Sequence, residues 1–211
     1  MTIWDARAAS YVDSDAHREG ADLDQLVAWA AGARTALDVA TGGGHVARRL
    51  REAGLEVVTS DPSPGMRPDV ICRAEDMPFA DGSFDVVACR VAAHHFEDVR
   101  RAVAEMARVA ADRVLLVDTL NMGEAVEEAE KLRDPSHVRN YDEGEWRTFV
   151  GDAGLVVVEV RFFQQAFDFE AWLERTGCEG ADAERALELL GERVADQRLT
   201  LDRIAIRAEK R

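Results

Sequence analysis

The sequence predicts an α/β fold in which helices cover both faces of a mostly parallel sheet. Segments rich in β-branched and apolar residues alternate along the chain with segments of helical periodicity, which is the pattern of such a fold. The stretch "LDVATGGGHVARRL" at 37–50 combines a strand, a glycine turn and a helix. With 211 residues, the chain is long enough for one domain of this class and short for two.

The apolar runs locate the strands of this sheet. We predict strands near residues 35–40, 55–61, 69–72, 84–90, 113–119, 155–162 and 199–207. Helices should fill most of the gaps, most clearly at 97–110, where apolar residues recur at helical spacing. A second helix begins at Asp142, whose side chain can cap it while Glu145 reaches back, and ends at Gly154.

Two connections depart from simple alternation. The segment "PSPGMRPD" at 62–69 is too short for the crossover helix that usually joins parallel strands. We therefore expect one sheet face to be thinly covered there, where a second copy of the chain could form a homodimer. The segment at 120–141 is longer than most connections in a compact domain, and long ordered connections often act as lids.

Composition limits the partners of the protein. There are 26 basic and 41 acidic residues, and the net charge of −15 opposes a broad electrostatic grip on nucleic acid or anionic membrane. The three cysteines have neither disulfide-framework nor zinc-site spacing, so no metal is expected. The first residues lack the pattern of a signal peptide, and no apolar run is long enough to span a bilayer. We expect a cytoplasmic protein with a small-molecule partner.

The glycine turn is the first chemical motif. Gly42, Gly44 and Ala47 fit the loose dinucleotide pattern G-x-G-x-x-A, and the helix N-terminus behind them can bind a phosphate or a carboxylate. Asp61 stands at the end of the second predicted strand, where a carboxylate can accept hydrogen bonds from a ribose. Asp38 disfavours a pyrophosphate and favours a ligand that carries an ammonium and a sulfonium, as S-adenosylmethionine does.

Further motifs follow in a recognisable order. They are Asp38 to Gly44, with Ala40 in place of a first glycine, then "VVTSDPSPGM", "AEDMPFADGSFDVVACRVAAHHF" and "DPSHVRNYDEGEW", and finally "LDRIAIRAEKR". Together they resemble the class I S-adenosylmethionine-dependent methyltransferases, in particular the small-molecule group similar to the ubiquinone and menaquinone biosynthesis C-methyltransferases.

This resemblance implies a Rossmann-like, doubly wound, mostly parallel sheet of seven strands with an antiparallel final strand. It also implies methyl transfer from S-adenosylmethionine to a small-molecule acceptor. Residues 1–211 would form one domain, with N-terminal helices at 1–33, a cofactor-binding half at 34–119, a lid-like insertion at 120–141 and a C-terminal half at 142–211. The cofactor-binding residues implied are Asp38, Ala40, Thr41, Gly42, Gly44, Asp61, Pro62, Met66, Ala74, Glu75, Asp76 and Arg90.

One position departs from the family pattern. The family usually has an aspartate just before the alanine of the adenine segment, and this chain has Arg73 before Ala74. Either Glu75 or Asp76 accepts the adenine amino group instead, or adenine is held mainly by backbone and stacking.

Histidines are the candidates for the acceptor side. Methyl transfer is an in-line displacement that needs mainly positioning, and a histidine base helps when the acceptor carries a proton. We predict His94 and His137 as catalytic residues, although packing and helix capping explain the His94–His95 pair about equally well. The predicted substrate-binding residues are His95, Arg139, Tyr141 and Phe163. A nucleoside-binding module without turnover and a nicotinamide-dependent oxidoreductase are the alternatives.

Overall fold

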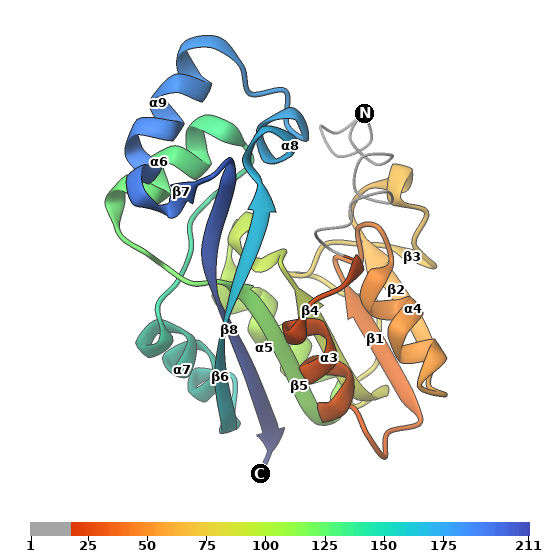
Figure 1. Ribbon diagram of the computed structural model, residues 1–211. Coiled ribbons are helices and arrows are strands. Elements are labelled where there is room, and N and C mark those ends of the chain that lie inside the picture. Colours follow the sequence, from red (N-terminus) through yellow and green to blue (C-terminus); the bar gives the residue numbers. More distant parts are fainter. Residues whose placement is uncertain (1–17) are drawn as a thin grey trace.

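The computed structural model of the protein describes residues 18–211 (Figure 1). Of the N-terminal helices predicted at 1–33, residues 1–17 lie outside the described part, and α3 (Ala21–Trp29) lies within it. Among the described residues, no helix is both long enough and apolar enough to cross a membrane.

The described chain forms one sheet that confirms the predicted fold class. The strands are β1 (Thr35–Val39), β2 (Glu56–Asp61), β3 (Val70–Ile71), β4 (Phe84–Arg90), β5 (Ala110–Thr119), β6 (Leu155–Asp168), β7 (Val194–Ala195) and β8 (Arg198–Lys210). Seven of them follow the order β3-β2-β1-β4-β5-β8-β6, and the short β7 pairs with β8 alone. The first five of that order are parallel, and β8 runs antiparallel to both β5 and β6. The antiparallel final strand is therefore as predicted.

Helices cover both faces of the sheet because their apolar stripes pack on its alternating side chains. In Figure 1, α3 lies in front of the sheet and α5 (Val99–Val109) behind it. Leu23 and Leu26 of α3 share a buried cluster with residues of α4 (His45–Glu52). The other face buries α5 together with α7 (Glu143–Asp152).

The predicted helix boundaries rest on side-chain caps that the structure contains. Asp98 accepts a hydrogen bond from the backbone of Arg101 at the start of α5. At α7, Asp142 and Glu145 form the predicted capping box. The shortened crossover is also confirmed, since the described residues between β2 and β3 contain a single helical turn, η1 (Pro64–Met66).

The last two long strands extend beyond the sheet, which was not predicted. Strand β6 continues to Asp168, well past its predicted end at residue 162, and stays paired with β8 as far as Arg198, next to the predicted start of that strand at residue 199. At the top of Figure 1 this two-stranded ribbon reaches the helices α6 (Glu124–Arg133), α8 (Phe169–Glu174) and α9 (Gly180–Leu190). These elements share their own apolar cluster. Gln164 and Gln165 interrupt the apolar run of β6, so the sequence pattern does not predict that the strand continues.

A buried ion trio ties α3 to the carboxyl edge of the sheet. Asp22 accepts hydrogen bonds from Arg90 Nε at 2.8 Å and from Arg203 Nη1 at 2.7 Å. All three side chains are buried. Burial raises the pKa of Asp22, but the two guanidinium groups outweigh it and hold the pKa below its ordinary value.

We predict that Asp22→Ala lowers the free energy of unfolding by about 3–5 kcal/mol, because it leaves two buried cations without their carboxylate. Asp24→Ala, on the same helix, is the matched control. Asp24 pairs with Arg49 at the surface, where loss of an ion pair costs about 1 kcal/mol at most. Urea denaturation of the three proteins measures both values, and equal losses for the two variants would contradict the assigned role of the trio.

Candidate active site

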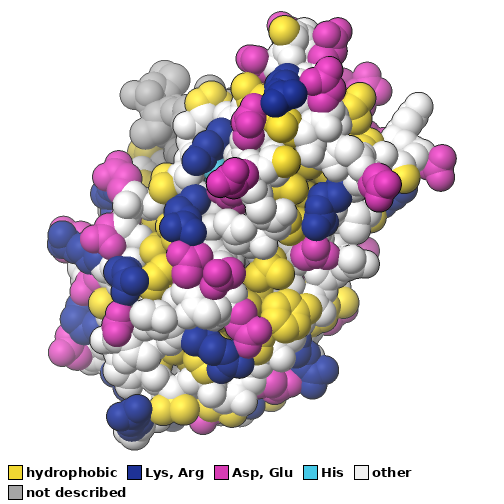
Figure 2. Space-filling model, turned by 90° about the vertical axis from the view of Figure 1, so that its left-hand side faces the viewer, with side chains coloured by type: hydrophobic (Ala, Val, Ile, Leu, Met, Phe, Trp, Pro, Cys, Tyr) yellow, Lys and Arg dark blue, Asp and Glu magenta, His cyan; other side chains and the backbone are white. Residues whose placement is uncertain are grey.

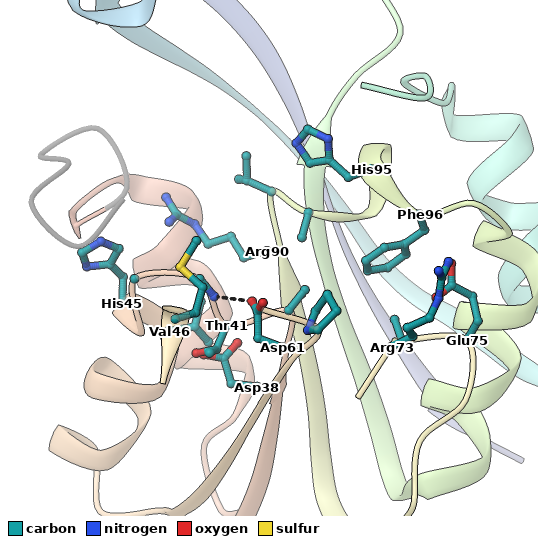
Figure 3. A pocket seen from close by; sticks show the side chains of 18 of the residues that line it. Asp38, Thr41, His45, Val46, Asp61, Arg73, Glu75, Arg90, His95 and Phe96 are labelled. Carbon is teal, nitrogen blue, oxygen red and sulfur yellow. Dashed lines mark hydrogen bonds and ion pairs between the residues drawn. The ribbon is translucent and has the colours of Figure 1, made fainter. Parts of the chain in front are cut away.

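A cavity of about 390 Å³ opens at the carboxyl edge of the sheet. Its wall comes from the turns after β1, β2 and β4 and from the segment after β3, all of which end at this edge. In open α/β sheets ligands bind at such an edge. Figure 3 shows Asp38 and Asp61 on one side of the cavity and His95 on the other. The predicted residues that line the cavity are Asp38, Ala40, Thr41, Gly42, Asp61, Pro62, Met66, Ala74, Glu75, Arg90 and His95.

The glycine turn after β1 has the backbone that its sequence predicts. Gly42 and Gly44 have φ values of 51° and 73°, in the region that favours glycine. Ala40, which replaces the first glycine of the family motif, also has a positive φ of 52°. A left-handed non-glycine residue costs roughly 1–2 kcal/mol, so the fold accepts strain beside the cavity.

Asp38 connects the first strand to the helix behind the turn. Its Oδ2 accepts hydrogen bonds from Thr41 Oγ1 at 2.5 Å and from the backbone N of Ala47 at 3.0 Å. Burial dominates these interactions and raises the pKa of Asp38 to about 6. A positive charge in the cavity would therefore favour the ionised carboxylate.

Asp61 joins the ends of the first two strands. Its Oδ2 accepts a hydrogen bond from the backbone N of Gly42 at 3.0 Å, and its Oδ1 accepts one from Ser63 at 2.9 Å. Figure 3 draws the contact with Gly42 as a dashed line. The carboxylate is thereby fixed at the cavity wall, where two ribose hydroxyls could reach it.

Arg73, at the position that departs from the family pattern, lies beside two glutamates. Arg73 pairs with the exposed carboxylate of Glu97 at 2.9 Å and approaches Glu75 at 3.4 Å. Glu75 is buried and accepts backbone hydrogen bonds from Glu97 and Asp98, all through Oε1. Asp76 is exposed and does not line the cavity. Of the two acidic alternatives for adenine, the structure brings Glu75 to the cavity.

The chain turns sharply where β4 ends. Arg90 lines the cavity while its guanidinium binds Asp22. The next residue, Val91, has a φ of 54°, which is an outlier for a β-branched side chain. Its backbone N donates to Val117 at 2.7 Å. This turn directs the following helical turn η2 (Ala93–His95) across the edge of the sheet.

Three histidines gather beyond this turn. The ring centroid of His94 lies 4.1 Å from that of His95 and 5.4 Å from that of His137. His94 is buried, and its Nδ1 contacts Asp118 Oδ1 at 2.6 Å. Of the three, His95 lines the cavity.

His137 lies beside two glutamates, Glu127 and Glu130. Its Nε2 lies 3.2 Å from Glu127 Oε2 and 3.9 Å from Glu130 Oε2. Asn140 donates to both glutamates. Within the described part of the chain, His137 and the two glutamates are the group whose ligand atoms, all within 4.8 Å of one another, could hold a cation. Of these three residues, His137 and Glu127 lie within hydrogen-bond distance of each other, and Glu130 accepts from Asn140, whose buried Oδ1 has no hydrogen-bond partner among the described residues.

The other predicted site residues have different surroundings. The Tyr141 ring packs in the buried aromatic cluster of α7, and exposed Arg139 pairs with Glu145. Phe163 packs on the α3 side of the sheet. The predicted residues outside the cavity wall are Gly44, Asp76, His94, His137, Arg139, Tyr141 and Phe163.

Several wall residues were missed by the sequence analysis. The glycine run itself pointed to His45 and Val46, which begin the helix behind it. Phe96 follows the histidine pair directly. The residues that line the cavity without having been predicted are Gly43, His45, Val46, Arg73, Val91, Ala92, Phe96 and Glu97.

Comparisons with known proteins agree with this geometry. Residues 37–117 match the family model described as a methyltransferase domain. The uncharacterized methyltransferase YcgJ of Bacillus subtilis is 31% identical over 210 residues, which cover 88% of this chain and 83% of YcgJ. The crystal structure of YcgJ superimposes with a TM-score of 0.79 at 27% identity, covering 90% of this chain and 98% of that one.

Two further proteins are similar over less of their length or at lower identity. Demethylmenaquinone methyltransferase of Renibacterium salmoninarum is 41% identical over 83 residues, 35% of each chain. Magnesium protoporphyrin IX methyltransferase of Synechocystis, solved with bound S-adenosylmethionine, shares the fold at a TM-score of 0.57 and 15% identity, covering 90% of this chain and 78% of that one. From the match to YcgJ and the methyltransferase domain, this chain belongs to the class I S-adenosylmethionine-dependent methyltransferases and is an enzyme of that family.

Proposed function

We propose that this enzyme transfers a methyl group from S-adenosylmethionine to a small-molecule acceptor within the cavity at the carboxyl edge of its sheet. One observation carries the proposal: a single cavity joins a nucleoside-type wall, with Asp61 and the glycine turn, to a wall that contains His95. A donor bound along the first wall would present its methyl group toward the second. Family membership favours this donor over the dinucleotide that G-x-G-x-x-A also permits.

The cofactor would lie along the ends of three strands. The ribose would bind Asp61 and the adenine would lie between Glu75 and Phe96, which is buried and faces the cavity. The methionine end would then reach Asp38 and Arg90. Asp38 would offer a carboxylate to the ammonium, and Arg90, whose guanidinium binds Asp22, lines the cavity beside it.

The acceptor would enter from the histidine side. A histidine base would remove the acceptor proton as the methyl group arrives. His95 lines the cavity, and His94 and His137, whose rings lie next to it, would act through His95. The loop that carries His137 is bound to this side, because Val138 and Arg139 donate backbone hydrogen bonds to the carbonyl of His94. Residues 120–141 would thus serve as the predicted lid within a single domain.

The remaining partner predictions rest on charge and on the thin sheet face. Figure 2 views the molecule from the side of α6 and α7 and shows acidic and basic side chains interspersed, without a continuous basic surface on that face. This distribution fits a neutral or small acceptor better than nucleic acid. A cytoplasmic location and a homodimer across the 62–69 segment stay predictions.

We predict that S-adenosylmethionine and S-adenosylhomocysteine bind the purified protein with micromolar affinity and that Asp61→Ala weakens both at least about 100-fold, through loss of charge-assisted ribose hydrogen bonds. Isothermal titration measures this. Asp85→Ala is the matched control, because Asp85 also accepts two backbone hydrogen bonds, from Arg34 and Thr35, but at the opposite edge of the sheet. Absence of binding by the unaltered protein would contradict the proposed function.

A second prediction concerns adenine. If Glu75 accepts from the adenine amino group, S-adenosylhomocysteine should bind roughly 10-fold more tightly than S-inosylhomocysteine, which lacks that group. Glu75→Gln should reduce this preference, and the exposed neighbour change Asp76→Asn should leave it intact. Competitive titration of the two ligands measures the preference in each protein, and an unchanged preference in Glu75→Gln would show that backbone and stacking hold adenine.

A third prediction concerns pH. The pKa of Asp38 is raised to about 6, so the free enzyme takes up a proton as the pH falls through that value. An ammonium ligand favours the ionised carboxylate, so its binding releases this proton and its affinity should fall up to about 10-fold per pH unit below the raised pKa. S-adenosylhomocysteine titrated from about pH 8 to about pH 5 should show this loss. 5′-Methylthioadenosine, which has no ammonium, should not, and equal pH dependence of the two ligands would refute the contact.

A further inference from the structure

Helix α6 and the loop that follows it bring three side chains of the metal-binding kind together. Glu127 and Glu130 lie one turn apart on α6, and His137 lies in the loop at 134–141. His137 Nε2 lies 3.2 Å from Glu127 Oε2 and 3.9 Å from Glu130 Oε2. Two ligand atoms that share one ion at about 2.1 Å each lie about 3–4 Å apart. The two distances from His137 are therefore those of ligands that could contact the same ion.

The charges of this group are not balanced by the protein. The side chains of Glu127, Glu130 and His137 are 13%, 8% and 2% exposed. Within the described chain, neither glutamate pairs with a lysine or an arginine, and their other polar partner is Asn140, which donates from its backbone N to Glu127 and from Nδ2 to Glu130. Even a protonated His137 would leave one negative charge. A bound cation would stabilise two carboxylates in such surroundings.

The side chain of Asn140 points to a cation independently. Asn140 is fully buried, and its Oδ1 has no hydrogen-bond partner among the described residues. A buried carbonyl oxygen without a partner is costly. Because Nδ2 contacts Glu130, the amide lies against the three ligand atoms, and half a turn about its last bond exchanges the positions of Nδ2 and Oδ1. Oδ1 would then face the Glu130 carboxylate, and a cation shared by the two oxygens would stabilise that arrangement.

The group is reached from the surface and is connected to the acceptor side of the active site. Glu127 also lines a surface hollow, to which α6 and the 134–141 loop both contribute. On its other side the loop is bound to His94, whose carbonyl accepts from the backbone of Val138 and Arg139. An ion bound here would therefore fix the loop between α6 and the turn after β4.

We propose that Glu127, Glu130, His137 and Asn140 form a binding site for one divalent transition-metal ion, such as Mn²⁺ or Zn²⁺, that fastens the 134–141 loop to α6. One imidazole nitrogen among oxygen donors favours these ions over Mg²⁺ and Ca²⁺, which take oxygen ligands. The four residues lie outside the wall of the active-site cavity, so the ion binds whether or not a methyl donor is present. The cysteine spacing, which predicts no metal, does not bear on a site of carboxylate, amide and imidazole ligands.

The test is isothermal titration of the full chain, first dialysed against EDTA, with MnCl₂, ZnCl₂ or MgCl₂ alone. We expect one Mn²⁺ or Zn²⁺ per chain and at least about 10-fold weaker binding of Mg²⁺. Glu130→Gln keeps the shape of the side chain but removes a ligand charge, and should weaken Mn²⁺ and Zn²⁺ binding at least about 10-fold. Glu128→Gln is the matched control and should leave both affinities unchanged, because Glu128 lines the same hollow but pairs with Arg185 at the surface.

A second variant keeps the test informative if Glu130→Gln does not fold. Asn140→Asp adds a ligand charge in the same shape, so it should bind Mn²⁺ and Zn²⁺ about 10-fold more tightly than the unaltered protein. The rise in its melting temperature on addition of metal should be larger as well. If Asn140 acts through its hydrogen bonds alone, Asn140→Asp will lose stability without gaining affinity.

Four results would overturn the proposal. They are absence of Mn²⁺ and Zn²⁺ binding by the unaltered protein, equal affinities for Mg²⁺ and the transition metals, equal affinities in Glu130→Gln and Glu128→Gln, and no gain of affinity in Asn140→Asp. Titration with S-adenosylhomocysteine tests the proposed function separately, because the two ligands bind different residues.

Discussion

Backbone amides at the carboxyl edge of the parallel sheet need acceptors once the chain turns away from the sheet, and aspartates at the strand ends supply them. Asp38 accepts from the first turn of α4, Asp61 from the glycine turn and its own loop, and Asp118 from the backbone of His94. A buried amide without an acceptor would cost about as much as a lost hydrogen bond. The turns that form the cavity therefore depend on these carboxylates, and the same groups face the ligand or hold the residues that do.

This use of carboxylates leaves the charges of the site unevenly compensated. Asp22 is paired with two arginines, which balance its negative charge inside the protein, and Asp118 contacts the ring of His94. Asp38 is held by two hydrogen bonds, and burial raises its pKa to about 6. A cationic ligand would supply the charge that this carboxylate lacks. The electrostatics of the site thus match a cofactor that brings an ammonium and a sulfonium, and do not match a pyrophosphate.

The sequence is sufficient for features that depend on local patterns. The strand at 84–90 and the capping box at Asp142 are found where their residues predict them, because a buried run and a cap each act within a few residues. The choice between His94 and His95 is different in kind. Both follow the same strand, and only the strained turn at Val91 and the long-range hydrogen bond to Asp118 decide which ring faces the cavity. Tyr141 likewise lies in a sequence motif but packs its ring in the core of α7.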